Sequence, residues 1–124
     1  MLLVDDERDF VDTLSKRLLA RDYLVAVAYG GDQALEIVAR DGCEVMILDL
    51  RMPGMGGIEV LQRIREEGHE VEVIILTGHG GAKEERAARA LGAFEYLHKP
   101  ADIDKLVDAM QRAHAKRNER RSAP

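Results

Sequence analysis

The chain has 124 residues, of which 46% are hydrophobic and 33% charged, which suits one packed domain and argues against intrinsic disorder. Aromatic residues make up 4% of the chain and Trp is absent, so an aromatic platform for single-stranded nucleic acid is not expected. The single cysteine, Cys43, argues against an internal disulfide framework and Cys-rich zinc sites.

No apolar run approaches the roughly 20 residues that a membrane helix needs. The first apolar residues run directly into Asp5, Asp6 and Glu7, which does not resemble a signal peptide. We therefore expect a soluble, cytoplasmic domain that does not bind membranes.

The net charge is −5, but basic residues gather near the C-terminus. They are Arg112, Lys116, Arg117, Arg120 and Arg121. Such a cluster can contact nucleic acid or a membrane surface, but cations are also favoured at the negative end of a helix dipole. The second interpretation is preferred because the cluster is short and lacks aromatic residues, so we expect no direct nucleic-acid binding. Residues 118–124 are predicted to be a basic frayed tail or the start of a linker.

The first half of the chain alternates apolar runs with amphipathic helical patterns. In chain order these are a run at 2–4, a helix on Phe10, Leu14 and Leu18, a run at 24–28, a helix on Ala34, Leu35 and Val38, and a run at 45–48. The helical residues recur with the spacing of one helix face. We predict that Asp32 caps the second helix and that Gly42 follows its end.

The second half continues the alternation. In chain order it has a loop at 52–57, a helix on Ile58, Leu61 and Ile64 that stops at Gly68, a run at 73–76, a helix at 83–91, a run at 94–97, and a helix on Ile103, Leu106 and Met110 capped by Asp102. Nearly continuous apolar strands between helices are typical of a parallel sheet covered on both faces. We therefore predict an α/β fold, a doubly wound five-stranded parallel sheet in the order 2-1-3-4-5, which is a flavodoxin-like (βα)5 arrangement.

Polar residues follow four of the five predicted strands. Asp5 and Asp6 follow the first, Asp49 the third, Thr77 the fourth and Lys99 the fifth. In an open α/β sheet, ligands bind outside the carboxyl ends of the strands, where the winding reverses. In the predicted order that point lies between the first and third strands, so the three aspartates are expected to lie together.

Carboxylates that share one crevice repel each other unless a cation joins them. A few oxygen ligands on one side suit Mg²⁺, and a lysine and a hydroxyl suit the oxygens of a tetrahedral anion. Taken singly, each residue has a simpler explanation, such as Asp5 and Asp6 opening a helix. Together they indicate phosphoryl transfer to a carboxylate.

The sequence also resembles the receiver domain of two-component response regulators. The segments that carry the resemblance are Leu3-Val4-Asp5-Asp6-Glu7, Ile47-Leu48-Asp49-Leu50-Arg51-Met52-Pro53-Gly54-Met55-Gly56-Gly57, Ile75-Leu76-Thr77-Gly78-His79, Leu91-Gly92-Ala93-Phe94-Glu95-Tyr96-Leu97 and Lys99-Pro100. The resemblance covers residues 2 to about 115, so we expect a receiver domain over residues 1–117.

The resemblance implies that Asp49 is the phosphoacceptor. It implies that Asp6 is a direct ligand of Mg²⁺, or of Mn²⁺ in its place, that Asp5 acts mainly through water, and that the backbone carbonyl of Arg51 is a further ligand. By the same resemblance, Asp49 itself is expected to complete the metal site.

The resemblance also assigns residues to the switch. Thr77 and Lys99 are expected to hold the phosphoryl oxygens, and Tyr96 matches the aromatic residue that changes rotamer on activation. The Lys99-Pro100 peptide bond matches one that is usually cis in the family, and cis bonds are essentially confined to proline.

Two positions suggest control of the lifetime of the phosphoryl group. Arg51 lies two residues after Asp49, and His79 lies two residues after Thr77. Both side chains are expected to flank the path of an attacking water. The alternative is that both are ordinary exposed loop residues.

The chain departs from the family pattern at three places. Gly78 follows Thr77, where alanine or serine is also common. Only three apolar residues precede Asp5, so we expect that residues have been lost at the start. Ala101 stands where many DNA-binding regulators have phenylalanine, which weakens a link to the winged-helix branch.

The leading hypothesis is a phosphoacceptor that is catalytic only towards itself. A histidine kinase or a phosphotransfer domain is expected to supply the phosphoryl group, and a downstream effector or a second receiver copy is expected to bind the activated domain. The main alternative is a phosphohydrolase with an aspartyl-phosphate intermediate, although its Asp-x-Asp motif is replaced here by Asp5-Asp6-Glu7. A third hypothesis is an adaptor that has lost phosphorylation.

Overall fold

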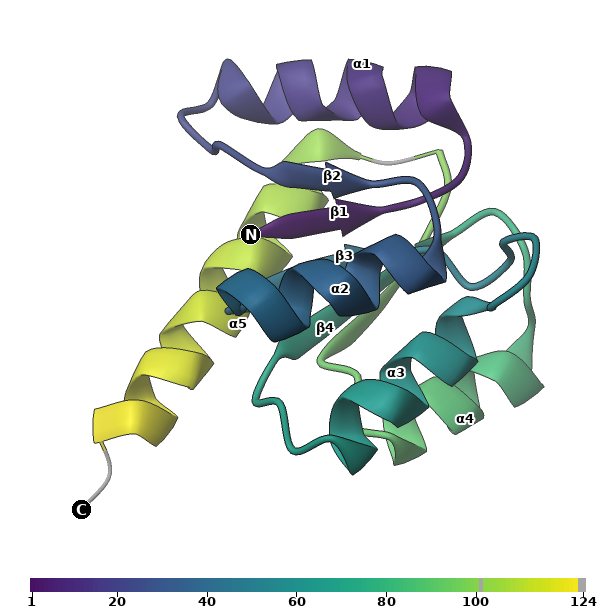
Figure 1. Cartoon of the computed structure of the whole chain (residues 1–124). Helices are drawn as coiled ribbons and strands as arrows, with labels where there is room; N and C mark the ends of the chain where they lie inside the picture. Colours follow the sequence, from purple (N-terminus) through teal and green to yellow (C-terminus); the bar gives the residue numbers. More distant parts are fainter. Residues whose placement is uncertain (101, 123–124) are drawn as a thin grey trace.

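Strands and helices alternate along the chain (Figure 1). The computed structural model describes residues 1–100 and 102–122; Ala101, Ala123 and Pro124 lie outside the described residues. The elements of the described part are β1 Leu2–Val4, α1 Arg8–Leu19, β2 Ala26–Ala28, α2 Gly31–Asp41, β3 Val45–Leu48, α3 Gly57–Glu66, β4 Glu72–Thr77, α4 Ala82–Ala90, β5 Glu95–His98 and α5 Ile103–Ser122.

The strands form one parallel sheet in the order β2-β1-β3-β4-β5, which confirms the predicted fold. Val4 of β1 pairs with Leu48 of β3. Asp5 directly follows Val4 and Asp49 directly follows Leu48, so the two aspartates leave neighbouring strands at the same level. Thr77 of β4 pairs with His98 of β5, so Lys99 follows the partner of Thr77. The topology therefore brings all four residues to the same edge of the sheet.

Helices cover both faces of the sheet (Figure 1). Alternate residues of β1 and β3 face opposite sides: Leu2 and Met46 belong to the cluster packed under α2, α3 and α4, whereas Leu3 and Ile47 belong to the cluster under α1 and α5. Each large buried side chain contributes roughly 1.5–3 kcal/mol of transfer free energy. Among the described residues, no helix combines the length and the apolar character needed to cross a membrane.

Two local predictions are wrong at the second βα unit. Strand β2 begins at Ala26, and Leu24, which we placed in the strand, is 81% exposed. The cap predicted at Asp32 does not form, because α2 begins at Gly31 with Gly30 as its N-cap and no side-chain cap. The side-chain oxygen of Gln33 instead accepts a hydrogen bond from the Tyr29 N–H at 2.9 Å.

Two other helix ends agree with the sequence. Gly42 follows α2 with φ +75°, a conformation that favours glycine. The carboxylate of Asp102 accepts hydrogen bonds from the N–H groups of Asp104 and Lys105 at the start of α5, as an N-cap should.

The last helix extends further than we predicted. Helix α5 continues through Ser122, past residue 117 and into the segment expected to be a frayed tail. The guanidinium of Arg117 donates to the backbone carbonyl of Glu70 at 3.0 Å, which ties this part of α5 to the loop before β4. The division of the chain at residue 117 stays a prediction.

Candidate functional site

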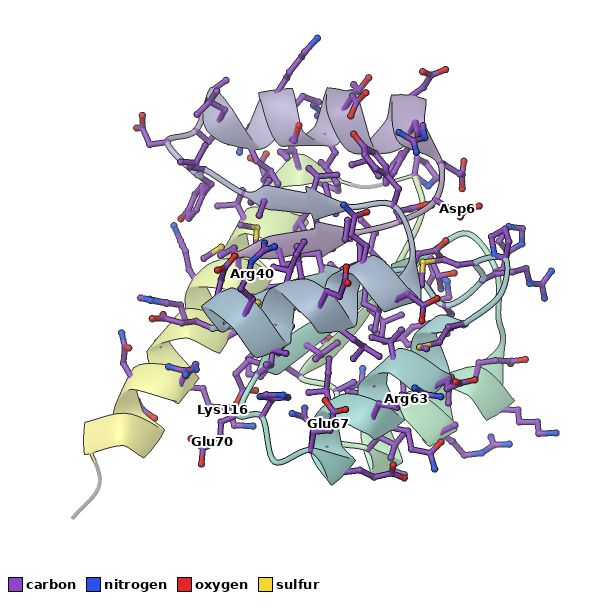
Figure 2. All side chains as sticks on the ribbon, in the orientation of Figure 1. Asp6, Arg40, Arg63, Glu67, Glu70 and Lys116 are labelled. Atoms are coloured by element: carbon purple, nitrogen blue, oxygen red, sulfur yellow. The ribbon has the colours of Figure 1, made fainter. Side chains whose placement is uncertain are left out.

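Three carboxylates meet at the carboxyl edge of the sheet. One ligand atom from each of Asp5, Asp6 and Asp49 lies within 4.8 Å of those of the other two. Asp5 is 1% exposed and Asp49 2%, whereas Asp6 is half-buried and lies just beyond the end of β1 (Figure 2). The sequence prediction that these residues gather is confirmed.

Lys99 enters the same group from the end of β5. Its Nζ lies 2.7 Å from Oδ2 of Asp5 and 3.9 Å from Oδ2 of Asp49. Burial lowers the pKa of Lys99, but its hydrogen bonds to the carboxylates of Asp5 and Glu7 outweigh burial and leave the pKa above its ordinary value. Lys99 is therefore an ammonium ion at neutral pH.

Burial raises the pKa of Asp5, against the opposing effect of its hydrogen bond from Lys99. The charge of Asp49 raises this pKa further. Asp5, Asp6 and Asp49 thus share this edge of the sheet with the single ammonium of Lys99, and clustered carboxylates of this kind favour an additional cation.

Glu7 belongs to the site, although we did not predict it. Its Oε1 lies 3.0 Å from Nζ of Lys99, and its backbone N–H donates to Oδ1 of Asp5 at 3.0 Å. The ring of Phe10 lies 4.2 Å from the same Nζ, a cation–π contact. The only signal for Glu7 was its position beside the acidic pair, and Phe10 gave none beyond its helical spacing.

Asp49 combines burial with open acceptor atoms. Both carboxylate oxygens are buried, and neither has a hydrogen-bond partner in the described part of the chain. Buried polar atoms normally have a partner, so these two oxygens are available to a ligand. An all-oxygen group of this kind fits Mg²⁺, which binds through few carboxylates and shares itself with phosphate.

A glycine fixes the backbone around Asp49. A Cβ placed on Gly57 would lie 2.2 Å from the backbone oxygen of Asp49, so no other residue fits there without displacing the loop. The Gly57 N–H also donates to the carbonyl of Leu50 at 2.9 Å. The start of α3 therefore packs directly on the strand end that carries Asp49.

Thr77 ends β4 and is fully buried. Its Oγ1 accepts a hydrogen bond from the N–H of His79 at 3.1 Å, and its carbonyl accepts one from the N–H of Lys99 at 2.9 Å. The ends of β4 and β5 are thus tied together. Arg51 and His79 are exposed on the loops after β3 and β4.

Tyr96 lies inward beneath these loops. It is 6% exposed, and burial raises the pKa of its phenol, with smaller contributions from Glu84, Glu85 and Asp49. The Lys99-Pro100 bond that follows this strand is cis, as the family resemblance implies.

Comparisons with known proteins agree with this geometry. The model of the response regulator receiver domain matches residues 1–111. The response regulator MprA of Mycobacterium ulcerans is 34% identical over 111 residues, covering 90% of this chain and 48% of that protein. The chain therefore spans about half the length of the curated relatives it matches.

Two solved structures illustrate the likeness in three dimensions. A response regulator receiver domain protein from Clostridium thermocellum is 31% identical with a TM-score of 0.87, over 94% of each chain. The chemotaxis protein CheY4 of Vibrio cholerae is 28% identical with a TM-score of 0.83, over 90% of this chain and 95% of that one.

Proposed function

Since the chain belongs to the response regulator receiver domain family, whose members act in two-component signalling, we propose that Asp49 is its phosphoacceptor. The observation that carries this assignment is the Asp49 carboxylate itself. It is buried, its oxygens lack hydrogen-bond partners among the described residues, and it lies beside Lys99 and two further carboxylates.

In the proposed reaction a carboxylate oxygen of Asp49 attacks phosphorus. The new O–P bond forms as the bond between phosphorus and the donor atom breaks, and the donor leaves with that electron pair. Lys99 holds one phosphoryl oxygen, because its Nζ already lies 3.9 Å from Oδ2 of Asp49. The hydroxyl of Thr77, at the end of β4, holds a second.

Asp5, Asp6, Asp49 and the backbone carbonyl of Arg51 would hold Mg²⁺, with Mn²⁺ as a substitute. The bound ion would neutralise charge on the phosphoryl oxygens during transfer. Asp5 also holds the ammonium of Lys99 at 2.7 Å, so this residue links the metal ligands to the phosphoryl-binding lysine.

Response regulators of this family interact with histidine kinases and with effector domains. For this chain we propose that a histidine kinase or a phosphotransfer domain supplies the phosphoryl group in the cytoplasm, and that an effector or a second copy reads the phosphorylated state. We propose no direct contact of this domain with nucleic acid or membrane.

Incubation with Mg²⁺ and acetyl phosphate, followed by intact mass measurement, tests this function. A receiver gains a single phosphoryl group and does not turn over organic phosphates. Continuous release of phosphate from such substrates would favour the phosphohydrolase, and no adduct at all would favour the adaptor.

Mg²⁺ is expected to raise the melting temperature of the native chain. At a hundredfold excess over its dissociation constant a ligand adds about 2.7 kcal/mol to the free energy of unfolding. The gain should be much smaller in Asp6→Ala and unchanged in the control Asp9→Ala, an exposed acid of α1 outside the cluster. Equal gains in Asp6→Ala and the native chain would remove Asp6 from the ligand set.

The gain from Mg²⁺ should also depend on pH. The pKa of Asp5 is raised in the fold. The metal-free fold therefore loses stability as pH rises through the window from the ordinary pKa of an aspartate to the raised pKa of Asp5, because the folded protein gives up this proton less readily than the unfolded chain. Mg²⁺ needs the ionised form, so its stabilising effect should be largest above this window and fade as pH falls into it.

Arg51 and His79 are expected to control the lifetime of the phosphoryl group. Both side chains are exposed on loops that border Asp49 and Thr77, where they can obstruct or guide water. Decay of the adduct in Arg51→Ala and His79→Ala should differ from the native decay by at least a few-fold. Native half-lives in both variants would reject these roles.

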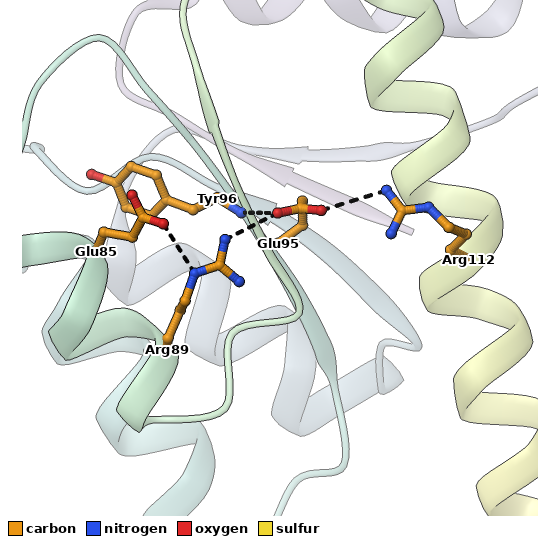
Figure 3. Close-up of polar contacts among 5 residues, drawn as sticks. All are labelled: Glu85, Arg89, Glu95, Tyr96 and Arg112. Carbon is orange, nitrogen blue, oxygen red and sulfur yellow. Dashed lines mark hydrogen bonds and ion pairs between the residues drawn. The ribbon is translucent and has the colours of Figure 1, made fainter. Parts of the chain in front are cut away.

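Phosphorylation is expected to strengthen self-association or effector binding through α4, β5 and α5. This face is polar: Glu85 pairs with Arg89, and Glu95 pairs with Arg89 and Arg112 (Figure 3). Coupling between sites is typically about 1–3 kcal/mol. Sedimentation with and without beryllofluoride tests the self-association. If neither the oligomeric state nor the hydrogen exchange of residues 83–107 changes, this face is not the output. The control Asp49→Asn should show no change in either measurement when beryllofluoride is added.

A further inference from the structure

A glycine in the loop between β4 and α4 lies close to the hydroxyl of the inward Tyr96. Gly80 has φ +100°, and a Cβ placed on it would lie 2.7 Å from the hydroxyl oxygen of Tyr96. Carbon and oxygen atoms that are not bonded do not approach so closely, so any side chain at this position meets the tyrosine. The neighbouring glycines differ: a Cβ on Gly78 would lie 3.7 Å from Lys99, and one on Gly81 would lie 3.8 Å from Glu84.

The hydroxyl of Tyr96 is not anchored by a hydrogen bond. Its oxygen is buried and has no partner within residues 1–100 and 102–122, although buried hydroxyls normally have one. The ring has an edge contact with His98, with centroids 5.3 Å apart. Packing rather than hydrogen bonding therefore holds the phenol inward, and a modest steric change can displace it.

The backbone of Tyr96 is much more firmly held than its side chain. Its N–H donates to Oε1 of Glu95 at 3.1 Å. The Glu95 carboxylate lies between Arg89 of α4 and Arg112 of α5, at 3.1 and 3.5 Å (Figure 3). We therefore expect a conflict at residue 80 to be relieved by rotation of the Tyr96 ring rather than by movement of β5.

We propose that Gly80 is a positioning residue for Tyr96, and that the bend of the loop at Gly80 and the buried tyrosine form one coupled unit. The bare backbone at residue 80 admits the hydroxyl, and a side chain there excludes it. Thr77 ends β4 three residues before Gly80, so movement of the loop that follows it towards Asp49 would change the space open to Tyr96. This consequence for signalling rests on the proposed function, whereas the coupling itself does not.

Nitration by tetranitromethane, mapped tyrosine by tyrosine in unphosphorylated protein, measures the coupling. If the outward position is populated at 10% or less in the native chain, nitration of Tyr96 should rise about tenfold or more in Gly80→Ala. Gly81→Ala is the matched control and should keep the native rate. Tyr23 and Tyr29 should keep theirs in every variant, which shows that the fold is intact. An unchanged rate at Tyr96 in Gly80→Ala, or an equal rise in Gly81→Ala, would overturn the proposal.

A double-mutant cycle separates the contact from strain in the loop, because alanine is also disfavoured at φ +100°. Tyr96→Phe removes the oxygen that a Cβ at residue 80 would meet. Gly80→Ala should therefore lower the urea midpoint clearly less in the Tyr96→Phe background than in the native one. Equal losses in both backgrounds would show that strain acts alone and would overturn the coupling.

Phosphoryl uptake by Gly80→Ala keeps this test distinct from that of the proposed function. Uptake on Asp49 with unchanged Tyr96 reactivity rejects the coupling and leaves the phosphoacceptor assignment intact. Increased Tyr96 reactivity in a chain that never accepts a phosphoryl group supports the coupling and rejects the assignment.

Discussion

Asp49→Asn is expected to abolish the phosphoryl adduct while preserving the fold. The amide has the shape of the carboxylate but lacks its nucleophilic oxygen. The change also removes one of the negative charges near the buried Asp5, so the metal-free variant should be at least as stable as the native chain, by up to about 1 kcal/mol. Intact mass after treatment with acetyl phosphate and Mg²⁺ measures the adduct, and thermal unfolding measures the stability.

The matched control is Asp32→Asn, which changes an exposed aspartate of α2 outside the acidic group. This variant should gain a phosphoryl group as the native chain does. The assignment of Asp49 is contradicted if Asp49→Asn still gains one phosphoryl group on another residue.

Lys99→Met is expected to destabilise the metal-free protein by about 3 kcal/mol, the typical cost of removing one partner of a buried ion pair. The side chains of Lys99 and Asp5 are 12% and 2% exposed, so solvent compensates little for the lost ammonium. Methionine keeps a stem of similar length but loses the ammonium and its contact with the Phe10 ring. Urea unfolding with and without Mg²⁺ measures the loss, which the metal should partly restore because it supplies a replacement positive charge.

Lys83→Met provides the control for this experiment, since Lys83 is exposed at the start of α4. Its stability should stay within about 0.5 kcal/mol of the native value, as is usual for surface changes. If Lys99→Met is as stable as the native chain without Mg²⁺, the lysine does not balance the carboxylates. Beryllofluoride should also bind Lys99→Met more weakly than it binds the native chain.

The sheet and the acidic group could be predicted because they depend on simple features of the chain. Runs such as Val45–Leu48 are buried along their whole length, as expected for a strand between two layers of helices. Once the strand order is assigned, Asp5 and Asp49 must lie together, because β1 and β3 are neighbours that end in register. No side-chain geometry is needed for that conclusion.

The exact starts of α2 and β2 could not be predicted, because the sequence offers more than one starting residue for each. Asp32 is a good capping residue, but with Gly30 as the N-cap the helix begins at Gly31, two residues before a helix capped by Asp32 would begin. Leu24 is apolar, yet it lies before the short paired segment of the edge strand β2 and remains exposed. Apolar character alone does not decide where an edge strand begins.

The contacts of Lys99 were also beyond sequence reasoning. Glu7 and Lys99 are 92 positions apart and meet only because both extend from the same edge of the sheet. The clash that links Gly80 to Tyr96 depends on one backbone angle and on the inward position of the ring. Pairings of this kind follow from the packed structure and have no periodic pattern.

The central claim is that this chain carries its phosphoryl group on Asp49, and the most direct test locates that group. The native chain is treated with acetyl phosphate and Mg²⁺, the acyl phosphate is reduced with borohydride, and the modified residue is identified by tandem mass spectrometry. We predict modification at Asp49 alone, and none when Mg²⁺ is chelated. Reduction at Asp5 or Asp6, or a phosphoryl group on a histidine or serine instead, would contradict the claim.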